Sequence, residues 1–159
     1  MEVTSQYLVR EASNDDVDAM VSLINRAFAV ESFFKSGDRI NAEQVRQMME
    51  AGKFLLLTFG DTLAACVWLK ITGDRGYLGT LSVAPDRQKS GLGSRMMREA
   101  EEYFRAAGCT AVDIRLVNLR QELPAIYRKF GFVETGTQSA EAIKSATRPI
   151  HFITMSKDL

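Results

Sequence analysis

The sequence is poor in the residues that would indicate a secreted, metal-binding or nucleic-acid-binding protein. Its 159 residues include two cysteines, three prolines and one histidine. Cys66 and Cys109 lack the close spacing of a zinc site or a disulfide framework, so we expect two buried, reduced thiols and no metal. Basic and acidic residues number 20 each, which gives no electrostatic reason to expect nucleic acid or an anionic membrane as a partner.

Long hydrophobic runs are also missing. The densest run, Phe54 to Phe59, is far shorter than the roughly 20 residues that a membrane-spanning helix needs. The first residues have neither the basic start nor the apolar stretch of a signal peptide. We therefore expect a cytoplasmic protein with a single domain over residues 1–159, and its 46% of hydrophobic residues suffices for a sizeable core.

The hydrophobic periodicity predicts a mixed α/β fold. Helical spacing of apolar residues covers 15–28, 42–50, 92–107 and 123–130, while strand patterns cover 7–11, 53–59, 62–71, 77–83, 111–117, 132–135 and 150–155. Asn14 and Asn41 are the predicted N-caps of the first two helices. A helix lies between strands 77–83 and 111–117, so these two should be parallel, whereas the strands before them form an antiparallel meander.

A glycine-containing turn stands between the third strand of the meander and the helix over 92–107. The turn reads Gln88-Lys89-Ser90-Gly91-Leu92-Gly93. A helix N-terminus carries unpartnered N–H groups and a partial positive charge, and glycine lets a ligand approach that backbone closely. The arrangement therefore predicts a binding site for a phosphate or pyrophosphate group.

Three features in this order resemble the GNAT superfamily of acyl-coenzyme A-dependent N-acetyltransferases. They are the strand that ends at Val83, the turn Gln88-x-x-Gly91-x-Gly93, and Asn118 followed by Tyr127 and then Gly131-Phe132. The order of elements matches that fold over nearly the whole chain. The resemblance implies a central, mostly antiparallel sheet with one splayed parallel pair of strands, flanked by helices.

The resemblance also implies how acetyl-coenzyme A would be held. Main-chain groups of the strand before the turn would pair with the pantetheine arm, the turn would hold the pyrophosphate, and Asn118 would hydrogen-bond pantetheine. The N–H of Leu81 or Val83 would stabilise the oxyanion. The implied cofactor-binding residues are Leu81, Ser82, Val83, Gln88, Lys89, Ser90, Gly91, Leu92, Gly93, Ser94, Asn118 and Tyr127.

Tyr127 takes the position of the general acid in this resemblance. A phenol with a pKa near 10 is protonated at neutral pH and can give its proton to the departing thiolate. The general base has no clear candidate, because residues 77–83 contain no carboxylate. Glu31 is our first choice, Asp38 and His151 are weaker ones, and a chain of water molecules would need no residue.

The acceptor pocket of this fold lies between the first two helices and the central strands. Phe28, Phe33 and Phe34 are predicted to form its apolar walls, although filling the core is an equal alternative. Alternation along 111–117 places Asp113, Arg115 and Val117 on one face. Arg115 either binds a substrate carboxylate or pairs with Asp113.

The leading hypothesis is therefore transfer of an acetyl group from acetyl-coenzyme A to a primary amine by direct attack in a ternary complex. The acceptor is a small molecule or a protein amine, and a homodimer is left open. The alternative is a non-catalytic module that senses acyl-coenzyme A. A dinucleotide-dependent oxidoreductase fits poorly, since continuing the glycine pattern requires glycine where the chain has Met96.

Overall fold

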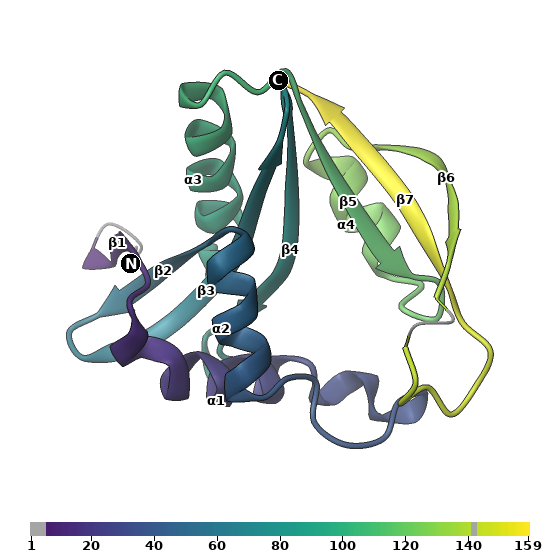
Figure 1. The fold of residues 1–159 in the computed structure, drawn as a ribbon, viewed down its shortest axis with the longest axis horizontal. Coiled ribbons are helices and arrows are strands. Elements are labelled where there is room, and N and C mark those ends of the chain that lie inside the picture. Colours follow the sequence, from purple (N-terminus) through teal and green to yellow (C-terminus); the bar gives the residue numbers. More distant parts are fainter. Residues whose placement is uncertain (1–5, 141–142) are drawn as a thin grey trace.

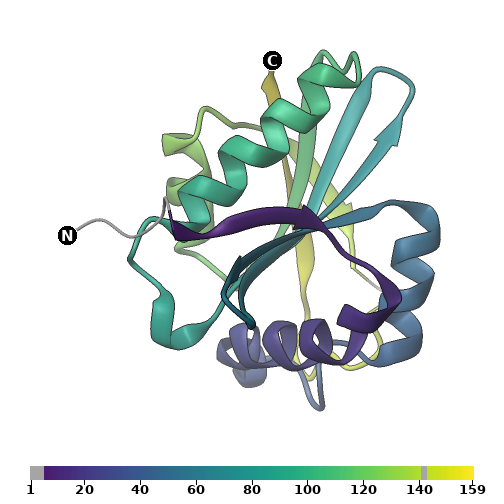
Figure 2. The ribbon, with the colours of Figure 1, turned by 90° about the vertical axis from the view of Figure 1, so that its left-hand side faces the viewer.

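A computed structural model describes residues 6–140 and 143–159, which form a seven-stranded mixed sheet with helices on both faces (Figures 1 and 2). The strands are β1 (Leu8–Glu11), β2 (Lys53–Phe59), β3 (Thr62–Thr72), β4 (Arg75–Val83), β5 (Ala111–Val117), β6 (Val133–Ser139) and β7 (His151–Asp158). The helices are α1 (Val17–Ala27), α2 (Ala42–Ala51), α3 (Leu92–Ala106) and α4 (Leu123–Lys129). The strand order is β1-β2-β3-β4-β5-β7-β6, and β4 and β5 form the parallel pair among these strands. The predicted mixed fold with one parallel pair is confirmed.

Local sequence explains most of the element boundaries. Asn41 caps α2 as predicted, because its side chain accepts from the N–H of Gln44 at 2.9 Å. The predicted cap of the first helix is wrong. A 3₁₀ turn over Asn14–Asp16 precedes α1, and Ser13 stands at its N-cap position. The Asp16 carboxylate accepts from the N–H of Ser13 at 2.8 Å, which leaves Asn14 inside the turn.

Two strands continue well past their predicted C-terminal ends. β6 runs to Ser139 and β7 to Asp158, and the two pair in antiparallel register from Val133↔Ser156 to Ser139↔His151. The residues of β6 are exposed and mostly polar, so their pattern carries no hydrophobic alternation that a sequence reading can detect. Pairing with β7 extends this strand.

Two core clusters cover the two faces of the sheet. On one face, Met96, Ala100 and Phe104 of α3 pack with Ile114 of β5 and with Tyr127 of α4. On the other face, buried residues of α1 and α2 pack on Phe54 and Leu56 of β2; these helix residues are Val17, Met20, Leu23, Ile24 and Val45. Figure 1 shows that β4 and β5 lie close at one end and diverge at the other, so that the sheet opens into two arms.

The open end of the two arms is bridged by loops. A 3₁₀ segment, η3 (Ala29–Phe33), follows α1 and crosses toward the arm of β5, β7 and β6 (Figure 1). There the chain after η3 pairs with the segment before β7, since the N–H of Ser36 donates to Ser145 O at 2.9 Å and the N–H of Thr147 donates to Phe34 O at 2.8 Å. These contacts bridge the two arms at their open end.

Candidate functional site

The splay between β4 and β5 is the feature on which the site depends. The two strands pair only from Arg75↔Ala111 to Tyr77↔Asp113. From Leu78 to Val83, the edge of β4 that faces β5 has no strand partner among the described residues. Backbone N–H and C=O groups on such an edge need hydrogen-bond partners, so this stretch of β4 can pair with an extended ligand.

A β-bulge lies on this unpaired stretch. Gly79 pairs with Trp68 and Ser82 with Cys66, so two residues of β4, Thr80 and Leu81, oppose the single residue Val67. Thr80 has φ of 54°, in the left-handed region that a β-branched residue rarely adopts. Such bulges bend a strand and re-aim its backbone groups, and they are over-represented next to active sites.

The turn before α3 presents free backbone donors to the same space. Gly91 at the N-cap of α3 has φ of 88°, and Lys89 has φ of 64°. The Ser90 hydroxyl donates to Arg87 O, which fixes the turn. No acceptor within the described chain takes the N–H groups of Lys89, Ser90 or Gly91. Together with the N-terminal N–H groups of α3, they form a site for an anion.

A single cleft of about 1310 Å³ joins the turn, the free edge of β4 and the space under the bridging loops. Its volume exceeds the roughly 300–1,000 Å³ of a typical small-ligand pocket. At the α3 end it is lined by Leu81, Val83, Gln88, Lys89, Gly91, Gly93, Ser94, Leu123, Ile126, Tyr127 and Phe130. At the α2 end it is lined by Phe28, Glu31, Lys35, Asp38, Arg39, Gln44, Gln47, Trp68, Tyr77, Arg115, Arg120 and Lys144.

Most of the predicted cofactor residues line the cleft; the exceptions are Ser82, Ser90, Leu92 and Asn118, the last of which is described below. Leu92 is buried in the core beneath α3, and Ser82 is buried with its hydroxyl on Thr80 O at 3.0 Å. The Ser90 side chain is used within the turn. Only the main-chain groups of these three residues are therefore available to a ligand.

Tyr127 reaches the cleft from α4. Its side chain is 9% exposed, and its ring packs edge-on against Phe132 with centroids 5.7 Å apart. Burial raises the pKa of Tyr127 to about 12, the charge of Arg120 lowers that pKa, and Tyr77 raises it. The phenol is therefore protonated at physiological pH and has a proton to donate.

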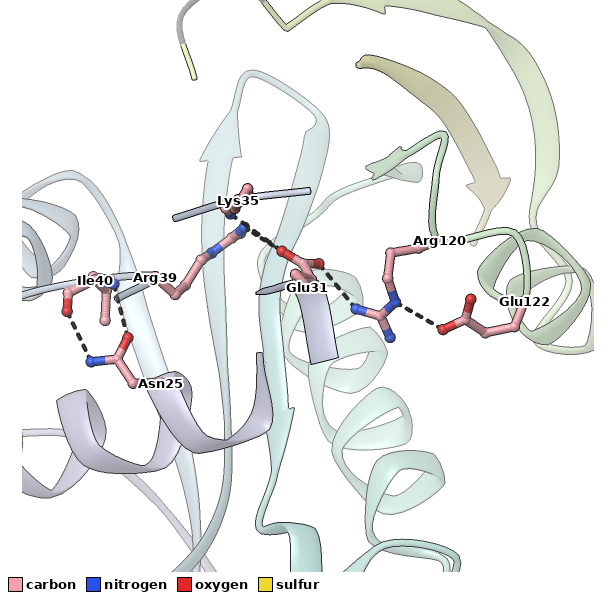
Figure 3. Close-up of polar contacts among 7 residues, drawn as sticks. All are labelled: Asn25, Glu31, Lys35, Arg39, Ile40, Arg120 and Glu122. Carbon is pink, nitrogen blue, oxygen red and sulfur yellow. Dashed lines mark hydrogen bonds and ion pairs between the residues drawn. The ribbon is translucent and has the colours of Figure 1, made fainter. Parts of the chain in front are cut away.

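Glu31 lies in the cleft, but its carboxylate is engaged with three cations (Figure 3). Its oxygens are 3.2 Å from Lys35 Nζ, 3.4 Å from an Arg39 nitrogen and 3.0 Å from an Arg120 nitrogen. The side chain is 5% exposed. A general base must offer a lone pair to the substrate, whereas both oxygens of Glu31 already accept from charged donors. Arg120 follows β5 and belongs to the other arm, so its ion pair with Glu31 joins the two arms. The geometry thus favours a structural role for Glu31.

The three phenylalanines have separate environments. Phe28 lines the cleft, where the Arg39 guanidinium lies 4.4 Å from the centre of its ring. Phe34 is fully buried with Val117 and Phe152, so core filling describes it better than a pocket wall. Phe33 is 48% exposed and does not line the cleft. The Phe33 ring packs edge to face on the Phe34 ring, with centroids 4.8 Å apart, and covers it on the solvent side.

Two polar candidates, Asn118 and Arg115, lie in different surroundings. Asn118 does not line the cleft; its side-chain oxygen accepts from the N–H of His151 at 2.9 Å, which continues the pairing of β5 with β7. Arg115 does line the cleft, and it does not pair with Asp113. Asp113 instead pairs with Arg75 at 2.7 Å, while the Arg115 guanidinium lies 4.3 Å from the centre of the Phe152 ring.

Several cleft residues have no counterpart among the sequence predictions. Trp68 and Tyr77 pack edge to face, with ring centroids 6.0 Å apart, and form an aromatic floor on the α2 side. Side chains alternate between the two faces of a strand. Assigning one face of β3 and of β4 to the core could therefore have placed Trp68 and Tyr77 on the opposite face, toward the cleft. Arg39 and Arg120 lie in loops without a motif, so no local signal identifies them.

The described residues contain neither a membrane-spanning helix nor a metal-binding cluster. No helix in residues 6–140 and 143–159 is long and apolar enough to cross a membrane. The same ranges hold no group of three or more histidine, cysteine, aspartate or glutamate side chains arranged to bind a metal ion.

The comparisons with known proteins agree with this geometry. Mycothiol acetyltransferases from Clavibacter michiganensis subsp. michiganensis and Clavibacter sepedonicus are 30% and 31% identical over 122 and 123 residues. Each match covers 74% of this chain and 40% of the relative, so the chain spans less than half the length of these relatives.

Solved structures share the fold. The ribosomal-protein-S18-alanine N-acetyltransferase from Escherichia coli superposes with a TM-score of 0.78 at 17% identity, covering 96% of this chain and 93% of that one. The structure of yncA from Salmonella typhimurium, which holds its cofactor acetyl-CoA, gives a TM-score of 0.71 at 14% identity over 97% and 94% of the chains. The model of the acetyltransferase (GNAT) family matches residues 17–132. The chain belongs to the acetyltransferase (GNAT) family.

Proposed function

We propose that this protein transfers an acetyl group from acetyl-coenzyme A to a primary amine. The observation that carries the proposal is the single cleft that joins the anion-binding turn at α3, the unpaired edge of β4 and the hydroxyl-bearing side chain of Tyr127. A pyrophosphate at the turn and a pantetheine arm along β4 would bring a thioester to the bulge at Thr80 and Leu81. The family and the mycothiol acetyltransferase relatives support the same activity.

The proposed reaction needs few protein groups, because the thioester of acetyl-coenzyme A is already activated. Acetyl-coenzyme A supplies an activated thioester; the amine nitrogen forms the new N–C bond as the C–S bond breaks. Tyr127 Oη donates its proton to the sulfur, and its high pKa ensures that the proton is present. The N–H of Leu81 or Val83 stabilises the carbonyl oxygen as negative charge develops there.

The acceptor must also lose a proton before it attacks. Within the described part of the chain, β4 offers no carboxylate and the Glu31 oxygens are held by cations. We therefore assign proton removal to water in the cleft, and we assign Glu31 to holding η3 against the β5–α4 loop. Asp38 lines the cleft and remains the other candidate for the base.

Steady-state kinetics of Tyr127→Phe test the proposal. Loss of the general acid should lower kcat about 10²- to 10⁴-fold, while the dissociation constant for acetyl-coenzyme A stays near that of the wild type. Tyr103→Phe is the matched control, because Tyr103 lies on α3 and does not line the cleft. An unchanged kcat in Tyr127→Phe would refute the acid role. Binding of acetyl-coenzyme A without acetylation of any amine in a broad panel would instead favour the sensing module.

A further inference from the structure

The α2 end of the cleft carries an excess of positive charge. The cations that line it are Lys35, Arg39, Arg115, Arg120 and Lys144, and the anions that line it are Glu31 and Asp38. The whole chain has a formal net charge of zero, so this excess is local. Charges of one sign in a cleft with low-dielectric walls raise the local concentration of oppositely charged ligands.

Glu31 does not balance all of these cations. Its carboxylate is shared by Lys35, Arg39 and Arg120, with Arg39 the most distant of the three at 3.4 Å. Arg120 has a second partner, since Glu122 lies 2.8 Å from its Nε. Arg115 makes no ion pair with any residue in the described ranges and is solvent-exposed above the Phe152 ring. Among the guanidinium groups at this end, Arg39 and Arg115 therefore retain the most capacity to bind an anion.

These two arginines act on one another. The pKa of Arg39 is lowered first by burial, and the positive charges of Arg115 and Arg120 lower it further, although Glu31 and Tyr77 raise it. Like charges held together destabilise the ligand-free site, and an anion bound between them would relieve that repulsion.

The position of Arg39 is fixed before any ligand arrives. Its neighbour Ile40 is held by two hydrogen bonds to the Asn25 side chain on α1, from Asn25 Nδ2 to Ile40 O and from Ile40 N to Asn25 Oδ1, both 3.0 Å long (Figure 3). The Phe28 ring supports the guanidinium at 4.4 Å. A guanidinium fixed in this way loses little entropy when it binds a ligand.

We propose that the amine acceptor also carries an anionic group, a carboxylate or a phosphate, which Arg39 and Arg115 bind. This inference rests on the proposed function and names its substrate class. Guanidinium groups match both anions with paired N–H donors. Arg115 lies on the face of β5 opposite Ile114 and Leu116, whose side chains pack in the same cluster as Tyr127. The anion would thus occupy the α2 end, while its amine reaches the bulge on β4.

Matched pairs of acceptors test the inference by turnover. The pairs are phenylalanine with phenethylamine, for a carboxylate, and O-phosphoethanolamine with ethanolamine, for a phosphate. We expect a kcat/KM about tenfold or more higher for the anionic member of at least one pair, and the pair that responds identifies the anion. Arg115→Gln should remove most of that preference, and so should Arg39→Gln. Arg98→Gln, on the exposed face of α3, should retain it.

Binding without turnover gives a second readout. Trp68 is the single tryptophan and lines the α2 end of the cleft, so its fluorescence can report ligands there. At constant ionic strength, titration with succinate should change the emission saturably, titration with succinamide should not, and Arg115→Gln should weaken the succinate response about tenfold or more.

The two experiments separate the two proposals. Succinate binding that depends on Arg115, with no amine acetylated, would refute the acetyltransferase proposal and leave the anion site in place. Acetylation that is equally fast for neutral and anionic amines, with no succinate response, would refute the anion site and leave the activity in place. A thermal unfolding curve for each variant confirms that it is folded, and the exposed Arg115 makes Arg115→Gln the safer of the two substitutions.

Discussion

The substitution Gly93→Ala distinguishes the effect of this residue on folding stability from its effect on ligand binding. Gly93 lies in the first turn of α3, it does not have a positive φ, and an added Cβ would meet nothing closer than Val83 Cγ2 at 4.0 Å. The protein alone therefore has no need for glycine at this position. Alanine should instead stabilise the helix by about 0.5–1 kcal/mol, which for a chain of this size raises Tm by about 1–4 °C.

The same methyl group should weaken acetyl-coenzyme A binding, because Gly93 lines the cleft where the pyrophosphate is proposed to approach the backbone. A ligand at 100 times its Kd stabilises the native state by about 2.7 kcal/mol. If the methyl group weakens binding about tenfold, the same concentration contributes only about 1.4 kcal/mol. The Tm increase caused by acetyl-coenzyme A should therefore fall to about half.

Differential scanning fluorimetry with and without acetyl-coenzyme A measures both effects in one experiment. Gly60→Ala is the control, since Gly60 lies in the β2–β3 turn outside the cleft at φ of 60°. That variant should lose stability but keep the full ligand-induced shift. A Gly93→Ala protein with raised Tm and an undiminished ligand shift would refute the close approach of the ligand at α3. A lowered Tm would refute the inference that the fold alone tolerates a side chain there.

Three further predictions concern the reactivity of the thiols, the ionisation of Tyr127 and the packing around Gly76. Burial raises the pKa of the Cys66 thiol to about 12 and also raises that of Cys109; neither should react with Ellman's reagent within minutes in the native protein, whereas both should react after denaturation. Tyr127, with its pKa near 12, should ionise only well above pH 10 in an ultraviolet titration. Its folded-state pKa exceeds its unfolded one, so wild-type stability should fall above pH 10 more steeply than that of Tyr127→Phe, and equal slopes would contradict the assignment. Gly76→Ala would place a Cβ 2.5 Å from the Phe104 ring where β4 and β5 pair. It should lower the free energy of unfolding, measured by chemical denaturation, by about 1–3 kcal/mol. Adding Phe104→Leu should recover part of that loss, and no recovery in the double variant would rule out the clash.

Local patterns were sufficient to predict the features that depend on neighbouring residues. The turn before α3 combines two glycines with a strand and an amphipathic helix, all within one short stretch. The parallel pairing of β4 and β5 follows from a helix between two strands, and the structure confirms it. The Asn41 cap depends on Gln44, three residues away, and it is also confirmed.

Features that depend on distant residues were not predictable in the same way. Glu31 meets Arg120, 89 positions away, so its neighbours in sequence say nothing about that partner. Phe33 and Phe34 are chemically identical, and only the packing of the second arm buries one of them. Asn118 is used by His151 of a strand that begins 33 positions later. The bulge at Thr80 also has no signal, because threonine is an unusual residue at a positive φ.

The most direct test of the central claim is to identify the product of the reaction. The protein would be incubated with acetyl-coenzyme A and a mixture of neutral and anionic primary amines, and the mixture analysed by mass spectrometry alongside a count of the thiol released. We predict an N-acetylated amine that forms only with active protein, in equal amount to the thiol, and that is sharply reduced in Tyr127→Phe. Saturable binding of acetyl-coenzyme A with no acetylated amine, or with thiol released in the absence of any amine, would contradict the account.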